Sequence, residues 1–390
     1  MFSSERNHID ISILIAVLTL MLLSLGVVYS ASSSYAFLKY GESEKMLITH
    51  AIKVFLGIGC MFIAMRMDYH KLQRFTKLAV VAAVGLLFVT LVLGGEAKGA
   101  TRWLRFGSIG FQPSEFAKYV LLFHLCTLIA VKGELIQDFK RGFIPVMVWI
   151  GCVTLLVMLQ PNFSMGSMIF LLSLVLLFVG RAKLSHLSLT FAVLVPVFFV
   201  YMMSAEYRRA RIMAFLSGNG GSGTKANYQV WQGILGFGNG GIFGVGPGES
   251  RQRDFFLPES YGDFVFSIVG EEYGFIGTIF FLTLFAVIMY RGFKIAKFAG
   301  DVFGRNLAIA ITCAITLYAL INAGVTLGIL PTTGLPMPFV SYGGSSMVFS
   351  ACAIGVLLNI SSQTDLHPRA RELTIDPVIV TNETSIGKVY

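Results

Sequence analysis

The sequence predicts an all-α integral membrane protein of about ten transmembrane helices, with a large extracytoplasmic loop between spans seven and eight. Of its 390 residues, 55% are hydrophobic and only 13% are charged, which is too apolar for an ordinary soluble domain. Apolar runs long enough to cross a bilayer recur along the chain. Lys and Arg are also unevenly shared between alternate connections, as the positive-inside rule describes.

Ten apolar runs define the expected spans. The first resembles the core of a signal peptide, but it is too long and many further runs follow, so we expect an uncleaved helix. The fifth and sixth runs are short and meet at a turn that contains Pro161. The runs lie at 11–31, 47–65, 77–94, 115–131, 143–159, 163–180, 184–203, 264–290, 306–329 and 345–361.

The basic residues orient the chain. Thirteen Lys and Arg lie in one set of connections, at 66–77, 132–142, 181–183 and 291–305. Five lie in the short loops opposite, at 32–46, 95–113, 160–164 and 330–343. We therefore expect both termini to be cytoplasmic, with 1–362 forming one polytopic domain and 363–390 a disordered polar tail. The 204–262 loop is then extracytoplasmic.

Several function classes are excluded. The net charge of +9 fits basic cytoplasmic loops, and no basic run interleaved with aromatics predicts a nucleic-acid partner. The five cysteines fall in apolar runs without CxxC spacing, so neither a disulfide framework nor a zinc site is indicated. The stretch 236–241 matches GxGxxG, but no strand–turn–helix unit surrounds it, and we reject a dinucleotide site.

The stretch 244–274 crowds glycines, arginines and carboxylates at the mouth of the eighth span. At about 100° per helical residue, Ser267, Gly270 and Gly274 lie within about 40° of Asp263, and Glu271 lies on the flank of that stripe. We expect this face to look into the bundle or a watery cavity, because polar groups are costly against lipid.

Asp263 stands at the outer end of that stripe. An aspartate before a helix is often only an N-cap. Glu259, Arg251 and Arg253 lie within twelve residues of it and favour a functional site. The surrounding 204–262 loop is glycine-rich, as a flexible linker would be, but its aromatic and aliphatic residues favour a re-entrant or interfacial cap.

Two other outward loops contain charged or glycine-rich clusters. Pro113 fits a helix start that Ser114 could cap, which makes Glu115 and Lys118 neighbours on one face. That pair could anchor the helix or line a substrate cavity. Arg102, beside Trp103, suits an interfacial anchor as well as a phosphate contact.

The last outward loop contains three prolines and leads into the tenth span. Its end, Ser341, Gly343, Gly344 and Ser345, could present backbone N–H groups to an anion at a helix start. Close packing of small residues between helices explains the same residues equally well.

Six blocks in this order resemble the SEDS family (shape, elongation, division and sporulation). They are KGATRW at 98–103, FQPSEFAK at 111–118, GVG at 244–246 with SRQR at 250–253, LPE at 257–259 with DF at 263–264, GEEYG at 270–274, and PFVSYGGSS at 338–346. The stretches 29–34 and 139–145 resemble the division branch, typified by FtsW, more than the elongation branch, typified by RodA. Thr333 weighs against that assignment, because FtsW-like chains often have lysine there. The 160–166 turn also departs from both branches, since it lacks an aspartate common to them.

The resemblance implies a peptidoglycan glycosyltransferase that polymerises lipid II at the outer face of the bacterial cytoplasmic membrane. It implies a class B penicillin-binding protein transpeptidase as partner, besides lipid II, the growing glycan strand and membrane lipid. Asp263 matches the family's essential aspartate, and Glu115 and Lys118 match its charged pair. Alternatives are a lipid II flippase, an elongation-type polymerase, and a scaffold that only recruits the transpeptidase.

Inverting transfer from a lipid diphosphate needs a base at the acceptor hydroxyl and cations at the leaving group. We expect Asp263 to be that base, or to hold a divalent cation, Mg²⁺ or Mn²⁺, that does equivalent work. The expected substrate-binding residues are Arg102, Glu115, Lys118, Arg251, Glu259, Glu271, Ser341, Gly343, Gly344 and Ser345.

Overall fold

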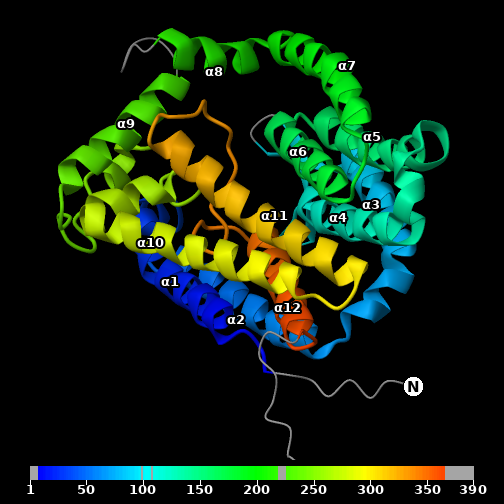
Figure 1. Cartoon of the computed structure of the whole chain (residues 1–390). Coiled ribbons are helices and arrows are strands. Elements are labelled where there is room, and N and C mark those ends of the chain that lie inside the picture. Colours follow the sequence, from blue (N-terminus) through cyan, green and yellow to red (C-terminus); the bar gives the residue numbers. More distant parts are fainter. Residues whose placement is uncertain (1–7, 98–99, 107–108, 218–224, 365–390) are drawn as a thin grey trace, which may run out of the picture.

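The computed structural model describes residues 8–97, 100–106, 109–217 and 225–364, and helices dominate this part of the chain (Figure 1). Eight of the described helices are long and apolar enough to cross a membrane, and two apolar helices of 17 residues are shorter. Each expected run coincides with one of them, although a count of ten crossings stays a prediction. They are α1 (Ile11–Tyr40), α2 (Lys45–Arg66), α3 (Tyr69–Leu93), α4 (Pro113–Lys132), α5 (Ile144–Leu159), α6 (Phe163–Val179), α7 (Leu184–Met203), α10 (Val265–Lys297), α11 (Val302–Thr326) and α12 (Ser345–Ser361).

Helix starts follow local capping chemistry. Asp10 caps α1 by accepting a hydrogen bond from the Ile13 N–H at 3.2 Å, and Asp301 caps α11 through the Gly304 N–H at 2.8 Å. Pro113 begins α4, as expected. The predicted Ser114 cap is wrong, because Gln112 is the N-cap residue and the Ser114 hydroxyl accepts from its side-chain amide at 3.1 Å.

A small antiparallel sheet occupies the stretch that we expected to be a loop between α3 and α4. Its strands, in the order β1-β2-β3, are β1 (Gly95–Ala97), β2 (Ala100–Phe106) and β3 (Ile109–Phe111). β-Branched and aromatic residues in β2 favour a strand. The Trp103 ring covers Gly110, where an added Cβ would lie 3.3 Å from the ring, so the glycine lets the strands pair beneath the indole.

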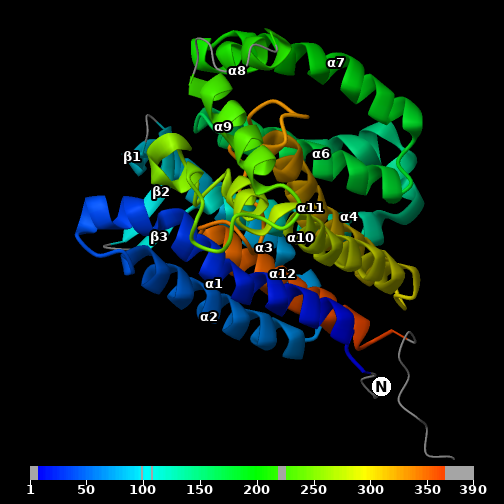
Figure 2. The same ribbon diagram turned by 90° about the vertical axis from the view of Figure 1, so that its left-hand side faces the viewer.

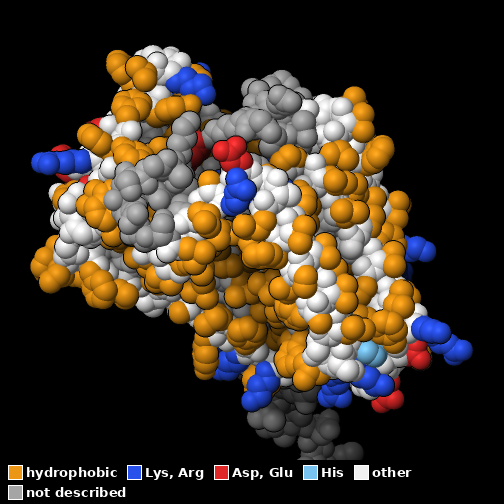
Figure 3. Space-filling model, turned by 90° about the horizontal axis from the view of Figure 1, so that it is seen from above, with side chains coloured by type: hydrophobic (Ala, Val, Ile, Leu, Met, Phe, Trp, Pro, Cys, Tyr) orange, Lys and Arg blue, Asp and Glu red, His pale blue; other side chains and the backbone are white. Residues whose placement is uncertain are grey.

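The bundle is built around α11. Of its most apolar 18-residue stretch, 78% is buried, against 11% for α7. α10 packs along α11, α2 along α12, and α3 along α4, while α1 contacts both α2 and α10. Apolar side chains are spread over much of the face shown in Figure 3, as expected of helices that contact lipid.

The 204–262 loop is folded. It contains α8 (Glu206–Ser217), α9 (Lys225–Gly240) and a π-helical turn, η3 (Gln252–Phe256). With α7, the first two helices form an arch over the bundle (Figures 1 and 2). The flexible-linker interpretation is therefore wrong for the described part of the loop, and the GxGxxG match lies at the end of α9, away from any strand.

Both ends of the described chain meet. The Asp10 N–H donates to the Ser361 hydroxyl at 3.0 Å, and Arg291 near the end of α10 pairs with the buried Asp10 carboxylate at 2.6 Å. The first and last apolar helices therefore begin and end on one side of the bundle, as an even number of spans requires. The tail beyond residue 364 lies outside the described residues.

Candidate active site at the mouth of α10

Asp263 ends a tight turn immediately before α10. The N-cap residue of α10 is Phe264 and no side-chain hydrogen bond caps the helix, so Asp263 is not a helix cap. The Asp263 carbonyl accepts from the Asn322 side chain at 2.7 Å, and the same amide donates to the Leu335 carbonyl at 2.8 Å. Asn322, buried in α11, thus ties the turn and the last outward loop to one point.

The last outward loop approaches the Asp263 carboxylate at Gly334. A Cβ added to Gly334 would lie 3.3 Å from Asp263 Oδ2, and the φ of Gly334 is +73°. Both the backbone conformation and the close contact therefore favour glycine here. The half-buried carboxylate therefore lies against Gly334, which brings together two loops that are distant in the sequence.

Glu259 lies at the start of the same turn in a strained conformation. Its φ is +57°, which is uncommon for a residue other than glycine, and its carbonyl accepts from the Gly262 N–H at 2.9 Å. Phe255 and Phe339 in the neighbouring loops also have positive φ. Such strain gathers at functional sites, where the surrounding structure maintains it.

The helix α10 is broken at Gly274, whose φ is +65° and ψ is −160°. The segment 241–246 fills the break. The N–H groups of Val245 and Gly246 donate to the carbonyls of Glu271 and Glu272 at 2.9 and 3.1 Å, and two N–H groups after the break donate back to residues 241 and 242. Such a break within an apolar helix is tolerated because its backbone groups are paired in this way.

Glu271 maintains the conformation of the loop that carries Arg251. Its carboxylate, 1% exposed, accepts from the Ser250 hydroxyl, from the Gln252 N–H at 3.2 Å and from the Asn239 side chain at 3.3 Å. Three protein donors enclose it, so this structure gives it a positioning role. Arg251 itself is exposed. Direct substrate contact by either residue stays a prediction.

Glu272 ties the loop to α1. Its buried carboxylate accepts from the Ser30 hydroxyl, and Arg253 Nη1 donates to the same hydroxyl at 3.3 Å. Asp254, beside Arg253, accepts from Ser34 at 2.6 Å. The serine-rich outer end of α1 therefore fixes one side of the loop.

The small-residue stripe on α10 faces the bundle, as expected, and α9 packs on it. A Cβ added to Gly233 of α9 would meet the Ser267 side chain, and one added to Gly236 would meet the Ser267 carbonyl. A Cβ added to Gly240 would meet the backbone of Gly270. Phe237 lies over Gly270. Glycines on both helices allow this close approach, as small residues do between membrane helices. The stripe is thus a packing surface and not a wet wall.

Glu115 and Lys118 form an ion pair inside the bundle. Their atoms are 2.8 Å apart, both side chains are 2% exposed, and the ammonium lies 4.2 Å from the centroid of the Tyr318 ring on α11. Tyr119 flanks the other side at 4.6 Å. The pair neutralises itself and joins α4 to α11, which favours the anchoring interpretation; a substrate contact stays a prediction.

Arg102 serves the fold in this structure. Its guanidinium donates to the carbonyls of Gln160 and Pro161 at the end of α5. Basic groups suit the negative end of a helix. Arg102 therefore joins β2 to the α5–α6 turn, and its described contacts favour an anchor over the predicted phosphate contact.

The segment 341–345 is bonded mainly to protein. The Ser341 hydroxyl accepts from the Met337 N–H at 2.8 Å, and the Ser345 hydroxyl accepts from the Gln112 N–H at 2.9 Å. Both hydroxyls therefore stabilise loops, whereas Gly343 and Gly344 are half-buried at the start of α12. The anion cradle predicted here stays a prediction at the two glycines.

Tyr342 connects this segment to the Asp263 turn. Its N–H donates to the Tyr261 carbonyl at 2.9 Å, and the two rings meet edge to face with centroids 5.9 Å apart. Burial raises the pKa of Tyr261 and the pKa of Tyr342 above the ordinary tyrosine value. Both hydroxyls are therefore neutral at physiological pH.

The structure thus brings Asp263, Glu259 and the last loop into one cluster, ties the loop that carries Arg251 to α10 through Glu271, and leaves Arg102 and the Glu115–Lys118 pair with separate structural contacts. Asn322 and Gly334 were not predicted from the sequence. A buried amide within the apolar run 306–329 was a usable signal for the first, because polar groups in spans are costly. The approach of Gly334 to Asp263 left no local signal.

The fit of a divalent cation can be judged from the donors. Among the described residues, no group of three His, Cys, Asp or Glu side chains could hold a metal by itself. Mg²⁺ is usually bound by one or two carboxylates together with substrate phosphates and water. Asp263, with Glu259 four residues before it, fits such a shared site.

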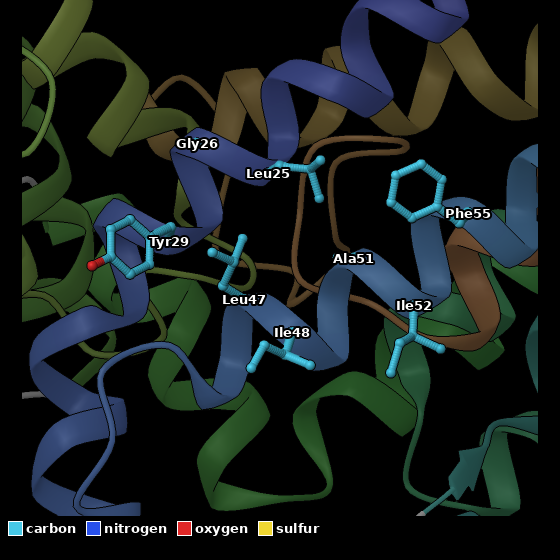
Figure 4. A pocket seen from close by; sticks show the side chains of 8 residues that line it. All are labelled: Leu25, Gly26, Tyr29, Leu47, Ile48, Ala51, Ile52 and Phe55. Carbon is cyan, nitrogen blue, oxygen red and sulfur yellow. The ribbon is translucent and has the colours of Figure 1, made fainter.

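A separate groove of about 760 Å³ lies between α1 and α2 (Figure 4). Its lining is apolar apart from the Tyr29 hydroxyl, and none of its residues belongs to the Asp263 cluster. The lining residues are Leu25, Gly26, Tyr29, Leu47, Ile48, Ala51, Ile52 and Phe55.

Comparisons with known proteins agree over most of the chain. The family model of cell cycle proteins named for FtsW, RodA and SpoVE matches residues 11–366. The "Probable peptidoglycan glycosyltransferase FtsW" of Geobacter metallireducens is 37% identical over 363 residues, covering 92% of this chain and 96% of that protein. "Stage V sporulation protein E" of Bacillus subtilis is 36% identical over 356 residues, covering 90% and 96%.

Solved structures share the fold. A chain from the structure described as "Structural coordination of polymerization and crosslinking by a peptidoglycan synthase complex" has a TM-score of 0.76 and 25% identity, covering 92% of this chain and 99% of that chain. RodA of Thermus thermophilus has a TM-score of 0.68 and 24% identity, covering 92% and 98%.

Proposed function

The chain belongs to the FtsW, RodA and SpoVE family of cell cycle proteins, and we propose that it polymerises lipid II into glycan strands with Asp263 as the catalytic residue. It is a multi-pass bacterial membrane protein and a peptidoglycan glycosyltransferase, like the relatives named above. Relatives named for division and sporulation favour those processes over elongation.

One observation carries the assignment to Asp263. Its carboxylate lies at a strained turn, beside Gly334, which leaves it room. The Asn322 side chain donates to the carbonyls of Asp263 and Leu335 and so fixes both segments of backbone. A base must be held at a defined point relative to the acceptor hydroxyl, because small misplacements are costly in rate. Asp263 is the carboxylate in the cluster that meets this requirement while staying half-exposed.

The proposed reaction is a single displacement. The acceptor hydroxyl loses its proton to the Asp263 carboxylate and its oxygen bonds to the donor sugar, while the bond from sugar to diphosphate breaks and its electron pair leaves with the lipid diphosphate. Attack opposite the leaving group inverts the sugar carbon, turning an α-linked donor into a β-linked glycan. Arg251, exposed on the loop held by Glu271, is suited to bind the negative charge of a substrate phosphate.

A divalent cation is the alternative role for Asp263. Held by Asp263 and Glu259 together with substrate phosphates, Mg²⁺ or Mn²⁺ would supply Lewis-acid stabilisation of the leaving group. A chelator distinguishes the two roles: activity that survives metal removal assigns the base function to Asp263, and activity restored only by Mg²⁺ or Mn²⁺ supports the cation.

The partner and the orientation are also proposals. A solved relative comes from a complex that coordinates polymerisation with crosslinking. We infer that this chain likewise pairs with a crosslinking transpeptidase of the class B penicillin-binding type. The excess of Lys and Arg in alternate connections supports cytoplasmic termini and an extracytoplasmic Asp263.

The decisive experiment supplies labelled lipid II to the purified full-length protein in detergent, where no leaflets exist for a flippase to connect. The parent protein should form glycan chains, and Asp263→Asn should lose at least about 100-fold in rate, as loss of a general base does. Asp254→Asn is the matched control, because Asp254 lies in the same loop with its side chain 51% exposed.

An Asp263→Asn protein that polymerises at the parent rate would refute the catalytic assignment. A folded parent protein, tested with its transpeptidase partner, that makes no glycan but moves lipid II across vesicle membranes would support the flippase instead. A scaffold function predicts that neither activity is seen and that loop substitutions leave recruitment of the partner intact.

A further inference from the structure

Lys53 is an ammonium group inside an apolar helix. It is the only Lys or Arg in the run 47–65, and its side chain is half-buried on α2. Its Nζ lies 4.2 Å from the centroid of the Tyr342 ring, close enough for a cation–π interaction. Across the part of the chain that the structure describes, no carboxylate lies within ion-pair distance of it, unlike Lys118 with Glu115.

A second group with unused hydrogen-bonding capacity lies against the same ring. His50, one helical turn before Lys53, is completely buried, with its ring centroid 5.7 Å from that of Tyr342. Its Nε2 lies 2.9 Å from the Ser24 hydroxyl, while its Nδ1 has no hydrogen-bond partner within the described residues. A buried polar atom left unpaired costs free energy and calls for an explanation.

This pair of groups adjoins the Asp263 turn. Tyr342, which both contact, is hydrogen-bonded to Tyr261, two residues before Asp263. The aliphatic stem of Lys53 runs beside Gly344, where an added Cβ would lie 3.4 Å from Lys53 Cε. The ammonium therefore lies at the junction of α2, the start of α12 and the proposed catalytic turn.

We propose that Lys53 is a binding residue for the phosphate groups of a lipid-linked diphosphate, with Tyr342 holding the ammonium in place. The identity of that lipid as the glycosyl donor or acceptor rests on the proposed function. Ionisable groups in spans are rare and mark substrate or ion paths, because the desolvation of an unpaired cation needs a compensating anion. A diphosphate supplies that anion while its hydrocarbon chain remains in the bilayer.

Binding of a synthetic polyprenyl diphosphate tests the proposal without turnover. The full-length protein, in phosphatidylcholine nanodiscs, is compared with Lys53→Met, Lys53→Arg and the control Lys45→Met, an exposed lysine on the same helix. Lys53→Met should weaken diphosphate binding about ten- to a hundredfold, as loss of a hydrogen bond to a charged group does. Lys53→Arg should keep most of the affinity, and neutral polyprenol should bind all four proteins alike.

A measurement on the unsubstituted protein covers the case in which Lys53→Met fails to fold. Polyprenyl diphosphate should protect Lys53 from an amine-reactive reagent, read by mass spectrometry, and should leave Lys45 reactive. A second set of nanodiscs that contain phosphatidylglycerol tests whether Lys53 binds the phosphate of an ordinary lipid headgroup instead. If phosphatidylglycerol protects Lys53 as well as the diphosphate does, the residue binds lipid headgroups and the proposal is wrong.

Equal diphosphate affinity in the parent and Lys53→Met, or no protection of Lys53, would also overturn the inference. Neither readout depends on polymerisation. If the protein binds the diphosphate through Lys53 but makes no glycan, only the proposed function is contradicted. If it makes glycan but its affinity for the diphosphate does not depend on Lys53, only the present proposal is contradicted.

Discussion

The chemistry assigned to Asp263 depends on neighbours that contribute little chemistry of their own. Gly334 contributes the absence of a side chain, and Asn322 contributes two hydrogen bonds to backbone carbonyls. A buried amide that satisfies two carbonyls fixes both segments at little cost in desolvation. The position of the carboxylate is thereby set by α11 and the last outward loop together.

Gly334→Ala should reduce polymerisation while leaving the protein folded. An alanine Cβ would lie 3.3 Å from Asp263 Oδ2, so either the loop or the carboxylate must shift. Misplacement by an ångström costs about 100-fold in rate, so we expect a loss of about tenfold or more. The rate with lipid II and the thermal midpoint in detergent measure the two effects.

Gly41→Ala is the matched control for this substitution. Gly41 has φ +77°, nearly that of Gly334, but no atom lies within 4 Å of its added Cβ. Both variants therefore carry the backbone strain of about 1–2 kcal/mol that a left-handed alanine costs. If the two lose activity equally, strain alone explains the effect and the contact with Asp263 does not matter.

At this scale the sequence predicts residue type better than residue contact. The position of Asp263 in a polar turn could be predicted, because a carboxylate at the mouth of an apolar run is costly unless it is used or shielded; its catalytic role stays a prediction. Glu271 was predicted to bind substrate from the same pattern, yet in the structure its carboxylate is enclosed by Ser250, Gln252 and Asn239. Those donors come from another segment, whose position no local pattern encodes.

Among the elements, α9 determines how the outer loop sits on the bundle. Its glycines pack on the backbone of α10 around Ser267 and Gly270, and the segment after it pairs with the break in α10. Close backbone contact between these helices gives van der Waals attraction that lipid would not replace. The loop carrying Arg251 is built on this contact.

Gly240→Val should detach α9 from α10. The new side chain would be forced into the Gly270 backbone, which cannot rotate away as a side chain could. Trypsin should then cleave after Arg251 and Arg253 faster than in the parent protein, by about tenfold if docking is worth about 1.4 kcal/mol. Mass spectrometry of the fragments over time measures the rates.

Gly238→Val separates docking from helix propensity. Gly238 lies two residues away on α9, and an added Cβ there meets no atom within 4 Å. The substitution changes propensity by the same amount and should leave cleavage at the parent rate. Equal acceleration in both variants would mean that α9 is weakened as a helix and is not held by Gly240.

The elements themselves were predictable in proportion to their apolar length. Runs of about twenty apolar residues can satisfy their backbone in a bilayer only as helices, which accounts for the agreement in the spans. The three-stranded sheet at 95–111 and the break at Gly274 were not predictable, because each depends on hydrogen bonds to segments remote in sequence or on short, weak local preferences.

In the molecule as a whole, the two ends of the helical bundle differ in structure. At one end, the two ends of the described chain meet through Asp10, Arg291 and Ser361, a compact set of polar contacts. At the other end lie the sheet, the folded loop and the Asp263 cluster. The fold therefore joins its first and last apolar helices at one end and places the strained Asp263 turn and the Arg251 loop at the other.

Which end faces the cytoplasm is testable with single cysteines. Glu42→Cys, in the exposed connection between α1 and α2, and Lys140→Cys, exposed between α4 and α5, are made in a chain whose five native cysteines are replaced by alanine. If positive connections are cytoplasmic, a membrane-impermeant maleimide should label Glu42→Cys in spheroplasts, and Lys140→Cys only after lysis. The opposite pattern would put Asp263 in the cytoplasm, where it could not extend a glycan strand outside the membrane, and the proposed function would have to be abandoned.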